Sequence, residues 1–262
     1  MVSQSLKQCG MRVVTVANRK GGVGKTSSVI QIASGLARRG ERVLAIDGDP
    51  QGNLTLFFGG KDKRDFGDML GAMASGAKIK TDDYVNRGVR RRLDIIPAKN
   101  RNLRLEMHDT DIASAYSPFA DFIDAIKERY DWVIIDSSPS NSPLERLLIR
   151  ASDAVIIPLE FQLFSISGLE SILDEVQFCA GDANRDIRVH SLIFTKAENR
   201  LNRVNTYRQV FSSFHIPIFE ICKSEYVTRS IEKSRTIWEC GPSSYAARDY
   251  ARIIEKGFLE TV

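Results

Sequence analysis

The chain has 262 residues, 43% of them hydrophobic, and a formal net charge of +4 at pH 7. This length favours one large α/β domain over residues 1–262 rather than two small ones, and the mild basic excess allows a polyanionic partner without requiring one. Residues 1–10 lack the apolar run of a signal peptide, and no segment approaches the ~20 apolar residues that span a bilayer. The four cysteines are scattered along the chain. We therefore expect a cytoplasmic protein with reduced thiols.

Short β-branched runs alternate with helical patterns along the chain. The expected strands are 12–17, 42–47, 93–98, 131–136, 153–159 and 187–194. The expected helices are 25–39, 118–129, 143–150, 165–180, 203–213 and 242–257. Most strands are apolar on both faces, as buried parallel strands are, so the fold class is α/β, a mostly parallel twisted sheet with helices on both faces. We expect residues 1–11 to be a flexible lead and residues 59–92 to be a short excursion from the core.

The stretch NRKGGVGKTS, residues 18–27, lies between the first strand and the first helix. It fits the phosphate-loop pattern G-x-x-x-x-G-K-[ST] except that Arg19 stands in place of the first glycine. Its glycines would let backbone N–H groups converge on phosphate oxygens at the start of a helix, with Lys25 reaching the β- and γ-phosphates and Thr26 binding Mg²⁺. An ordinary glycine-rich turn is the alternative. The candidate ATP-binding residues are Lys20, Gly21, Gly22, Val23, Gly24, Lys25, Thr26 and Ser27.

Carboxylates follow two of the other expected strands. Asp47 and Asp49 are two residues apart, so on a strand they face the same side, and strand ends of such sheets line the ligand crevice. A carboxylate there could orient the attacking water or hold the hydration shell of a metal, although Asp49-Pro50 also suits a simple turn. Asp136 comes after four apolar residues, at the expected carboxyl end of its strand.

Three segments, in this order, resemble the ParA/MinD family of deviant Walker A P-loop ATPases, most closely its small ParA-type members: K-G-G-V-G-K-T (20–26), D-G-D-P-Q-G-N (47–53) and D-S-S-P-S (136–140). The resemblance covers about residues 12–257, with Ser138 replacing the family's first proline in the third segment. It implies an ATP hydrolase that uses ATP and Mg²⁺. In that family the additional lysine, here Lys20, reaches into the nucleotide site of the partner subunit of an ATP-sandwich dimer. The implied catalytic residues are Lys20, Lys25 and Asp49, and the implied metal site is Thr26, Asp47 and Asp136.

Basic residues in the last third of the chain favour the DNA-binding branch of this family over the membrane-binding one. Residues 196–235 hold eight Lys and Arg against four Glu, and non-specific DNA binding needs little beyond cations aimed at phosphates. The candidate DNA-binding residues, chosen by charge and region, are Lys223, Arg229, Lys233 and Arg235. A solvated basic face is the alternative for each of them. A weaker second candidate is the cluster Arg87, Arg90, Arg91 and Arg92.

The resemblance therefore implies a nucleoid-associated protein for plasmid or chromosome partition. Its partners would be a second copy of the chain, non-specific DNA and a ParB-like adaptor. A MinD-like membrane-associated positioning ATPase is the alternative, but the C-terminal pattern, with Glu255 and Glu260 beside an apolar face, favours a helix packed on the sheet over one lying on anionic lipid. An electron-transfer ATPase resembling the nitrogenase iron protein would need two cluster-binding cysteines at positions that this chain does not supply.

Overall fold

The computed structural model describes residue 7 and residues 12–60, 63–99, 109–162, 164–183, 185–197 and 208–260. The strands are β1 (Val13–Val16), β2 (Val43–Gly48), β3 (Asn86–Arg90), β4 (Leu93–Ile96), β5 (Trp132–Ser137), β6 (Ala154–Leu159), β7 (Arg188–Ala197) and β8 (Ile218–Cys222). The helices are α1 (Lys25–Arg38), α2 (Asn53–Phe58), α3 (Phe66–Ala74), α5 (Asp109–Ile126), α6 (Pro143–Arg150), α7 (Phe164–Ala183), α9 (Glu225–Glu232), α10 (Ile237–Cys240) and α11 (Tyr245–Arg252), with a 3-10 turn η1 (Thr81–Asp83) and a π-helical segment η2 (Ile253–Leu259). Apart from residue 7, the expected flexible lead lies outside the described residues, as does the first part of the helix expected over 203–213.

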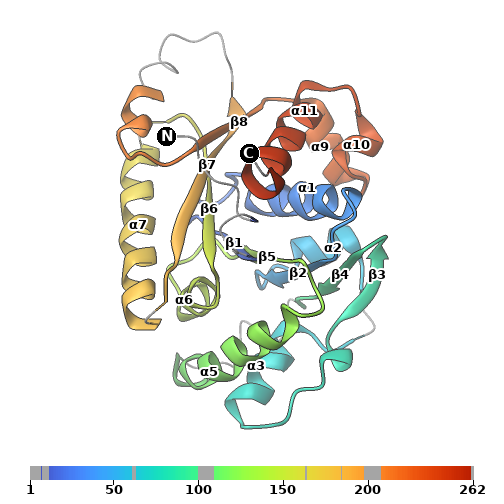
Figure 1. The fold of residues 1–262 in the computed structure, drawn as a ribbon, viewed down its shortest axis with the longest axis vertical. Coiled ribbons are helices and arrows are strands. Elements are labelled where there is room, and N and C mark those ends of the chain that lie inside the picture. Colours follow the sequence, from blue (N-terminus) through green and yellow to red (C-terminus); the bar gives the residue numbers. More distant parts are fainter. Residues whose placement is uncertain are drawn as a thin grey trace.

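The strands form one sheet in the order β3-β4-β2-β5-β1-β6-β7-β8. Every neighbouring pair is parallel except β3 with β4, which is antiparallel. The first strand of the chain lies in the middle, between β5 and β6, and all of its residues are buried. The predicted α/β class with a mostly parallel sheet is confirmed (Figure 1).

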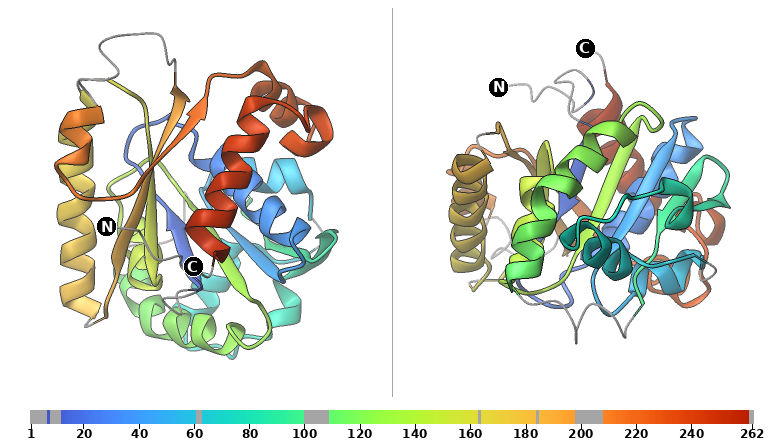
Figure 2. Two further views of the ribbon diagram at one scale, coloured as in Figure 1. Left: turned by 45° about the horizontal axis from the view of Figure 1, so that its top comes forward. Right: turned by 90° about the horizontal axis from the view of Figure 1, so that it is seen from below.

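Helices cover both faces of the sheet, as predicted. One face packs against α1, α2, α10, α11 and η2, and the opposite face packs against α3, α5 and α6 beneath the middle of the sheet and against α7 beneath β6 and β7. Figure 2 shows the two helical layers on either side of the strands. Among the described residues, no helix combines the length and apolarity needed to cross a membrane.

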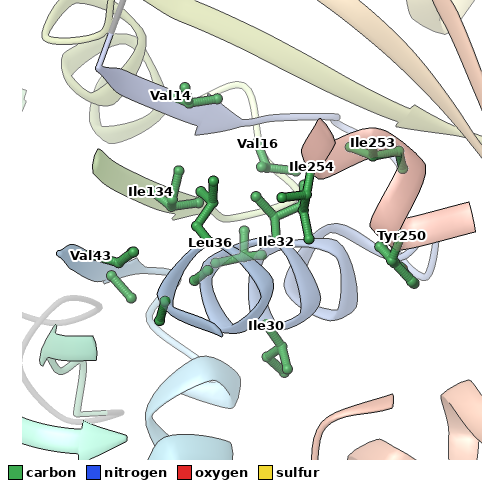
Figure 3. Packing of buried hydrophobic residues seen from close by; sticks show 14 of the residues in the cluster. Val14, Val16, Ile30, Ile32, Leu36, Val43, Ile134, Tyr250, Ile253 and Ile254 are labelled. Atoms are coloured by element: carbon green, nitrogen blue, oxygen red, sulfur yellow. The ribbon is translucent and has the colours of Figure 1, made fainter. Parts of the chain in front are cut away.

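The C-terminal segment packs tightly across the middle of α1. Ile253, Ile254 and Phe258 are at most 2% exposed, so the apolar face noted in the sequence is turned inward, as expected for a helix packed on the sheet side. Figure 3 shows Ile254 facing α1 above Ile32 and Leu36. The close approach requires a glycine, because a Cβ on Gly35 would lie 1.9 Å from Ile254 Cδ1.

The expectation that residues 59–92 leave the core is wrong. Four apolar side chains of α3, at the i, i+3, i+4, i+7 spacing of a helix face, are buried against α5: Phe66, Met69, Leu70 and Met73. The helix begins at a capping box in which the Asp65 carboxylate accepts a hydrogen bond from Asp68 N at 2.8 Å. The segment then supplies β3, the antiparallel edge strand.

Candidate nucleotide site

The loop between β1 and α1 has the geometry of an anion cradle. Gly22 and Gly24 have φ values of 76° and 88°, which disfavour a side chain, and a Cβ on Gly24 would lie 3.1 Å from Thr195 Cγ2. Neither a capping side chain nor an acidic residue occupies the first turn of α1. The N–H groups that open this helix are therefore left for a ligand, in the positive field of the helix end.

The remaining residues of the loop hold it in place. Val23 is buried, and its carbonyl accepts a hydrogen bond from Thr195 Oγ1 at 2.9 Å, while a Cβ on Gly21 would meet open space. Asn18 was not singled out from the sequence, yet its amide donates to Pro158 O at 2.6 Å and its Oδ1 accepts from Lys20 N at 2.8 Å. These contacts fasten the loop to the ends of β6 and β7.

The two lysines of the loop lie in contrasting environments. Lys25 is 7% exposed, and its Nζ donates to Lys20 O at 3.2 Å across the loop. Burial lowers the pKa of Lys25, while the charges of Asp136 and Asp49 act in the opposite direction. Lys20 is exposed, and its Nζ reaches away from the loop to Gln162 Oε1 at 2.6 Å.

Arg19, the residue in place of the first glycine, is tied to the helices of the opposite layer. Its guanidinium donates to Glu175 Oε2 of α7 at 2.6 Å, to Asn141 Oδ1 at 3.0 Å and to the Ser171 hydroxyl. Its Nε is 4.0 Å from Oε2 of Glu145, a fully buried residue of α6. The sequence pattern indicates that position 19 is unusual, but its partners are more than 120 residues away in the chain.

Glu145 is a second functional candidate that the sequence pattern missed. Neither of its carboxylate oxygens has a hydrogen-bond partner among the described residues. Burial raises its pKa to about 7, with Arg19 opposing the rise and Glu175 adding to it. Together with Arg19, it couples the phosphate loop to the helix that follows Asp136.

Asp47 and Asp136 are direct neighbours on β2 and β5, where they occupy the same register. Asp47 Oδ2 accepts hydrogen bonds from Thr55 N at 2.7 Å and from Thr55 Oγ1 at 2.6 Å. Burial nevertheless raises the pKa of Asp47 to about 7. The contacts show that this carboxylate fixes the start of α2, so any help to a metal would come from its remaining capacity as an acceptor.

Asp136 fits a metal site better than any other carboxylate of the described chain. It is fully buried, and neither oxygen has a hydrogen-bond partner among the described residues. Burial, and then the charge of Asp47, raise its pKa well above the usual value, while the Thr26 side chain partly opposes this without a well-aligned hydrogen bond to either oxygen. A carboxylate facing a hydroxyl suits Mg²⁺, which keeps several waters and takes other ligands from phosphates. The described residues hold no group of three or more acidic, His or Cys ligands.

Asp49 lies just beyond the end of β2 and is 6% exposed. Its Oδ1 accepts a hydrogen bond from Gln51 N at 2.9 Å, and its carbonyl accepts one from Gly52 N at 2.9 Å. The turn is therefore present, and the carboxylate is also close enough to Lys25 to influence the pKa of that amine. The turn interpretation of Asp49 is confirmed, and its catalytic role stays a prediction.

A cavity of about 460 Å³ opens beside Gly22 and Gly24, between the ends of β7 and β8 and helix α9. Ser27 of the loop lines it, as do Cys222 and Lys223. Lys223, proposed from the sequence as a DNA contact, thus lies on the wall of this cavity beside the phosphate loop. No local pattern indicates this, because only the pairing of β8 with β7 brings the segment to the loop.

The other three candidate DNA contacts are exposed on α9 and the turn after it. The Arg229 guanidinium lies 5.7 Å from the centre of the Tyr226 ring. Lys233 ends α9, and Arg235 influences the pKa of Glu239 at the start of α10. Of the second cluster, Arg87 pairs with Asp82 at 2.5 Å, and Arg90, Arg91 and Arg92 line a hollow at the end of α1. Arg92 also lines a second hollow together with Arg87.

Comparison with known proteins agrees with this site. A family model described as an AAA domain matches residues 11–189. The sporulation initiation inhibitor protein Soj of Bacillus subtilis is 30% identical over 192 residues, covering 73% of this chain and 75% of Soj. The chromosome partitioning protein ParA of Caulobacter vibrioides is 32% identical over 197 residues, covering 72% of this chain and 71% of that protein.

Solved structures share the fold over nearly the whole chain. An ATP complex of Cyanothece McdA matches with a TM-score of 0.81 at 20% identity, covering 96% of this chain and 98% of McdA. The septum site-determining protein MinD of Pyrococcus horikoshii, complexed with Mg-ADP, matches with a TM-score of 0.71 at 20% identity, covering 94% and 95%. With its glycine-bounded loop and the aligned Asp47 and Asp136, this chain belongs to the ParA/MinD family of P-loop ATPases, enzymes that hydrolyse ATP with Mg²⁺.

Proposed function

We propose that this ATPase forms an ATP-sandwich homodimer that binds DNA non-specifically, and that a ParB-like adaptor stimulates hydrolysis to drive partition of DNA or of another cargo. The name of one relative supports the partition role, since the Caulobacter vibrioides protein, 32% identical to this chain, is a chromosome partitioning protein. The setting would be the cytoplasm, on the nucleoid.

The contrast between the two lysines carries the proposal. Lys25 is buried within its own loop, where its ammonium group can contact phosphates bound in the same subunit. Lys20 is exposed and points away from that loop toward Gln162, so it can be redirected to a second subunit. A cation supplied in trans to a transferring phosphoryl group is worth ~10³–10⁵ in rate.

The other residues of the site divide the remaining work. The open amides of α1 and Lys25 would hold the phosphates, and Thr26 and Asp136 would hold Mg²⁺, which neutralises the charge on the phosphate oxygens. Asp49 would orient the attacking water from the end of β2. The 460 Å³ cavity beside the loop has the position and size to receive the base and ribose of ATP.

The membrane alternative lacks a comparable observation. The apolar side chains of the C-terminal segment that would meet lipid, Ile253, Ile254 and Phe258, are buried against α1 and its neighbours. Releasing them would expose Gly35 and Trp238, which they cover. The DNA-bound dimer therefore remains the function that the site supports best.

Replacing each lysine by alanine tests the proposal. Lys25→Ala should abolish ATP binding in calorimetry, and dimerisation with it. Lys20→Ala should keep ATP binding within a few-fold but remain monomeric with ATP in light scattering, with hydrolysis lowered at least ~10³-fold. Lys80→Ala, an exposed lysine after α3, is the matched control. A Lys20→Ala protein that dimerises and hydrolyses ATP normally would leave Lys20 as a surface residue and remove the sandwich dimer from the proposal.

A further inference from the structure

A hollow of about 400 Å³ lies at the opposite end of α1 from the phosphate loop. Five arginines line it, and we call it the arginine hollow: Arg38 and Arg39 from the end of α1, and Arg90, Arg91 and Arg92 from the end of β3 and the turn into β4. Trp238 and Glu239 of α10 complete its wall. These elements come from three separate parts of the chain and lie on one side of the molecule (Figure 1).

The charge of the hollow is largely uncompensated. Among the described residues, Arg38, Arg90, Arg91 and Arg92 have no carboxylate within salt-bridge distance, and Arg39 alone has such a partner, Glu255. Glu239 is the single acid on the wall, against five arginines. Burial raises the pKa of Glu239, but hydrogen bonds from Thr236 and then the charges of Arg90 and Arg235 lower it. The net result is a pKa below the usual value. Arg42, by contrast, is paired with Asp131 at 2.8 Å.

Arg90 is fixed in place by neutral groups. It donates to Val89 O at 2.7 Å and to Ser234 O at 2.9 Å, and its guanidinium lies 5.8 Å from the centre of the Phe58 ring. None of these contacts removes its charge. A guanidinium held by carbonyl groups and a ring keeps its field and has a defined direction, which suits recognition of an anion.

A purely structural role explains only part of the cluster. Cations at the end of a helix stabilise its negative pole, which accounts for Arg38 and Arg39. It does not account for Arg91 and Arg92 at the tip of the β3–β4 hairpin, where Asn and Gly are favoured. Arg92 has a φ of 61°, a conformation that costs a non-glycine residue about 1–2 kcal/mol. The chain thus accepts backbone strain at an arginine on the wall of this hollow, and the same residue also lines a second hollow with Asp82 and Asp94.

The hollow is independent of the nucleotide site but adjoins the predicted DNA surface. The 14 residues of α1 separate it from the loop by about 20 Å, since a helix rises ~1.5 Å per residue. Arg90 of the hollow donates a hydrogen bond to Ser234 O at 2.9 Å, and Ser234 is the chain neighbour of Arg235. The arginine hollow therefore borders Arg235 of the predicted DNA surface.

We propose that the arginine hollow is a principal DNA contact of this ATPase and receives phosphate groups of the DNA backbone. The proposal rests on the proposed DNA-binding function and names a surface for it on α1 and the β3–β4 hairpin, continuous with Arg235. Arginine suits this task because its planar, always-charged fork binds phosphate oxygens in pairs. No base reading is involved, so binding through the hollow is independent of sequence.

The test compares charge-matched double variants. Arg38→Gln with Arg91→Gln removes two cations from the hollow, and Lys78→Gln with Lys80→Gln removes two exposed cations after α3 as the control. Binding of a random-sequence duplex is measured by fluorescence anisotropy with ATP, from 50 to 200 mM salt. The control should keep the wild-type slope of log K against log salt. The hollow variant should lose up to about 3–4 units of slope per dimer, since each phosphate contact contributes ~0.9.

Trp238 gives a second reading on the unmodified protein. It is partly exposed in the hollow, whereas Trp132 is 1% exposed, so quenching by iodide reports mainly on Trp238. Bound DNA should protect it from iodide at equal ionic strength, whereas ATP alone should not.

The outcomes separate the inference from the function beneath it. If the wild-type protein fails to bind DNA with ATP, the proposed DNA-binding function itself is wrong. If the wild type binds but the hollow variant matches the control in slope and affinity, or iodide quenching is unchanged by DNA, only the hollow is ruled out and the contact lies elsewhere. A lower slope together with unchanged ATP binding supports the hollow.

Discussion

Removing the charge of Asp136 should stabilise the empty enzyme while disabling it. Its carboxylate is fully buried with no hydrogen-bond partner among the described residues, and Asp47 lies beside it on the next strand. An unsatisfied buried polar group costs ~1–3 kcal/mol, and more if charged. Asp136→Asn relieves the charge with little change in volume. Because 1 kcal/mol corresponds to ~2–4 °C in a domain near this size, the nucleotide-free variant should melt about 2–12 °C higher.

The pH dependence of this gain has a defined sign. The pKa of Asp136 is raised in the folded state above the unfolded value of 3.8, so the folded protein binds the extra proton and loses stability as pH rises past the unfolded value, until the folded pKa is reached. An asparagine has no such loss. The advantage of Asp136→Asn in melting temperature should therefore grow as the pH rises from 3.8 toward the folded pKa of Asp136.

Mg·ATP should reverse the ranking. Ligand at roughly 1,000 times its Kd adds about 4.1 kcal/mol to the wild type, more than the ~1–3 kcal/mol that the substitution gains, and the variant should lose most of that addition because one of its magnesium ligands is gone. Asp153→Asn is the contrasting control, since the Asp153 carboxylate accepts hydrogen bonds from Arg12 N at 2.9 Å and Val13 N at 2.8 Å, so that its replacement should lower the melting temperature. Differential scanning calorimetry decides the matter. A destabilised Asp136→Asn protein, or one that Mg·ATP stabilises as fully as the wild type, would refute this account of the site.

Three other changes probe separate parts of the molecule. Asp49→Ala should slow hydrolysis and accumulate as an ATP-bound dimer in gel filtration; a monomer with ATP would mean that Asp49 builds the site. Arg229→Ala with Arg235→Ala should reduce the salt slope of DNA binding by up to about 4 per dimer with ATP binding unchanged in calorimetry, and an unchanged slope would exclude the α9 region. Gly35→Ala should cost ~1–3 kcal/mol of stability through overpacking, because the new Cβ would lie 1.9 Å from Ile254 Cδ1. The higher helix propensity of alanine should offset ~1 kcal/mol of that cost. Ile254→Val, which removes that atom, should restore part of the loss in urea denaturation.

Features written in local patterns could be predicted from the sequence. The central strands are continuous apolar runs, and the structure places β2, β5 and β6 within a residue or two of the expected bounds. The helix expected over 143–150 matches α6. The loop glycines and the Asp136 carboxylate near the end of β5 could be predicted for the same reason, because strand, turn and helix are neighbours in the chain. By contrast, β3 and β8 were missed, since edge strands carry weaker apolar patterns.

Features that depend on distant parts of the chain could not be predicted. Arg19 and Glu175 meet only because α7 packs beside the loop, and their separation of 156 residues leaves no local pattern. Lys223 has the charge of a DNA contact but lies on the wall of the 460 Å³ cavity beside the phosphate loop. The number of basic residues in a segment shows that cations are present, but it does not show which surface of the fold they lie on.

The position of β1 also sets when this enzyme can first work during its synthesis. Val13 pairs with Val133 and Val14 with Ala154, so the strand that carries the phosphate loop has neither neighbour until the later strands exist. At ~5–20 residues per second, a ribosome needs roughly 6–30 s to supply them. During that interval the apolar strand β1 has neither of its neighbouring strands. Contacts between segments so distant in the chain also form slowly. The nucleotide site is therefore completed only after residue 154 has been made, and ATP cannot assist the folding of the first half of the chain.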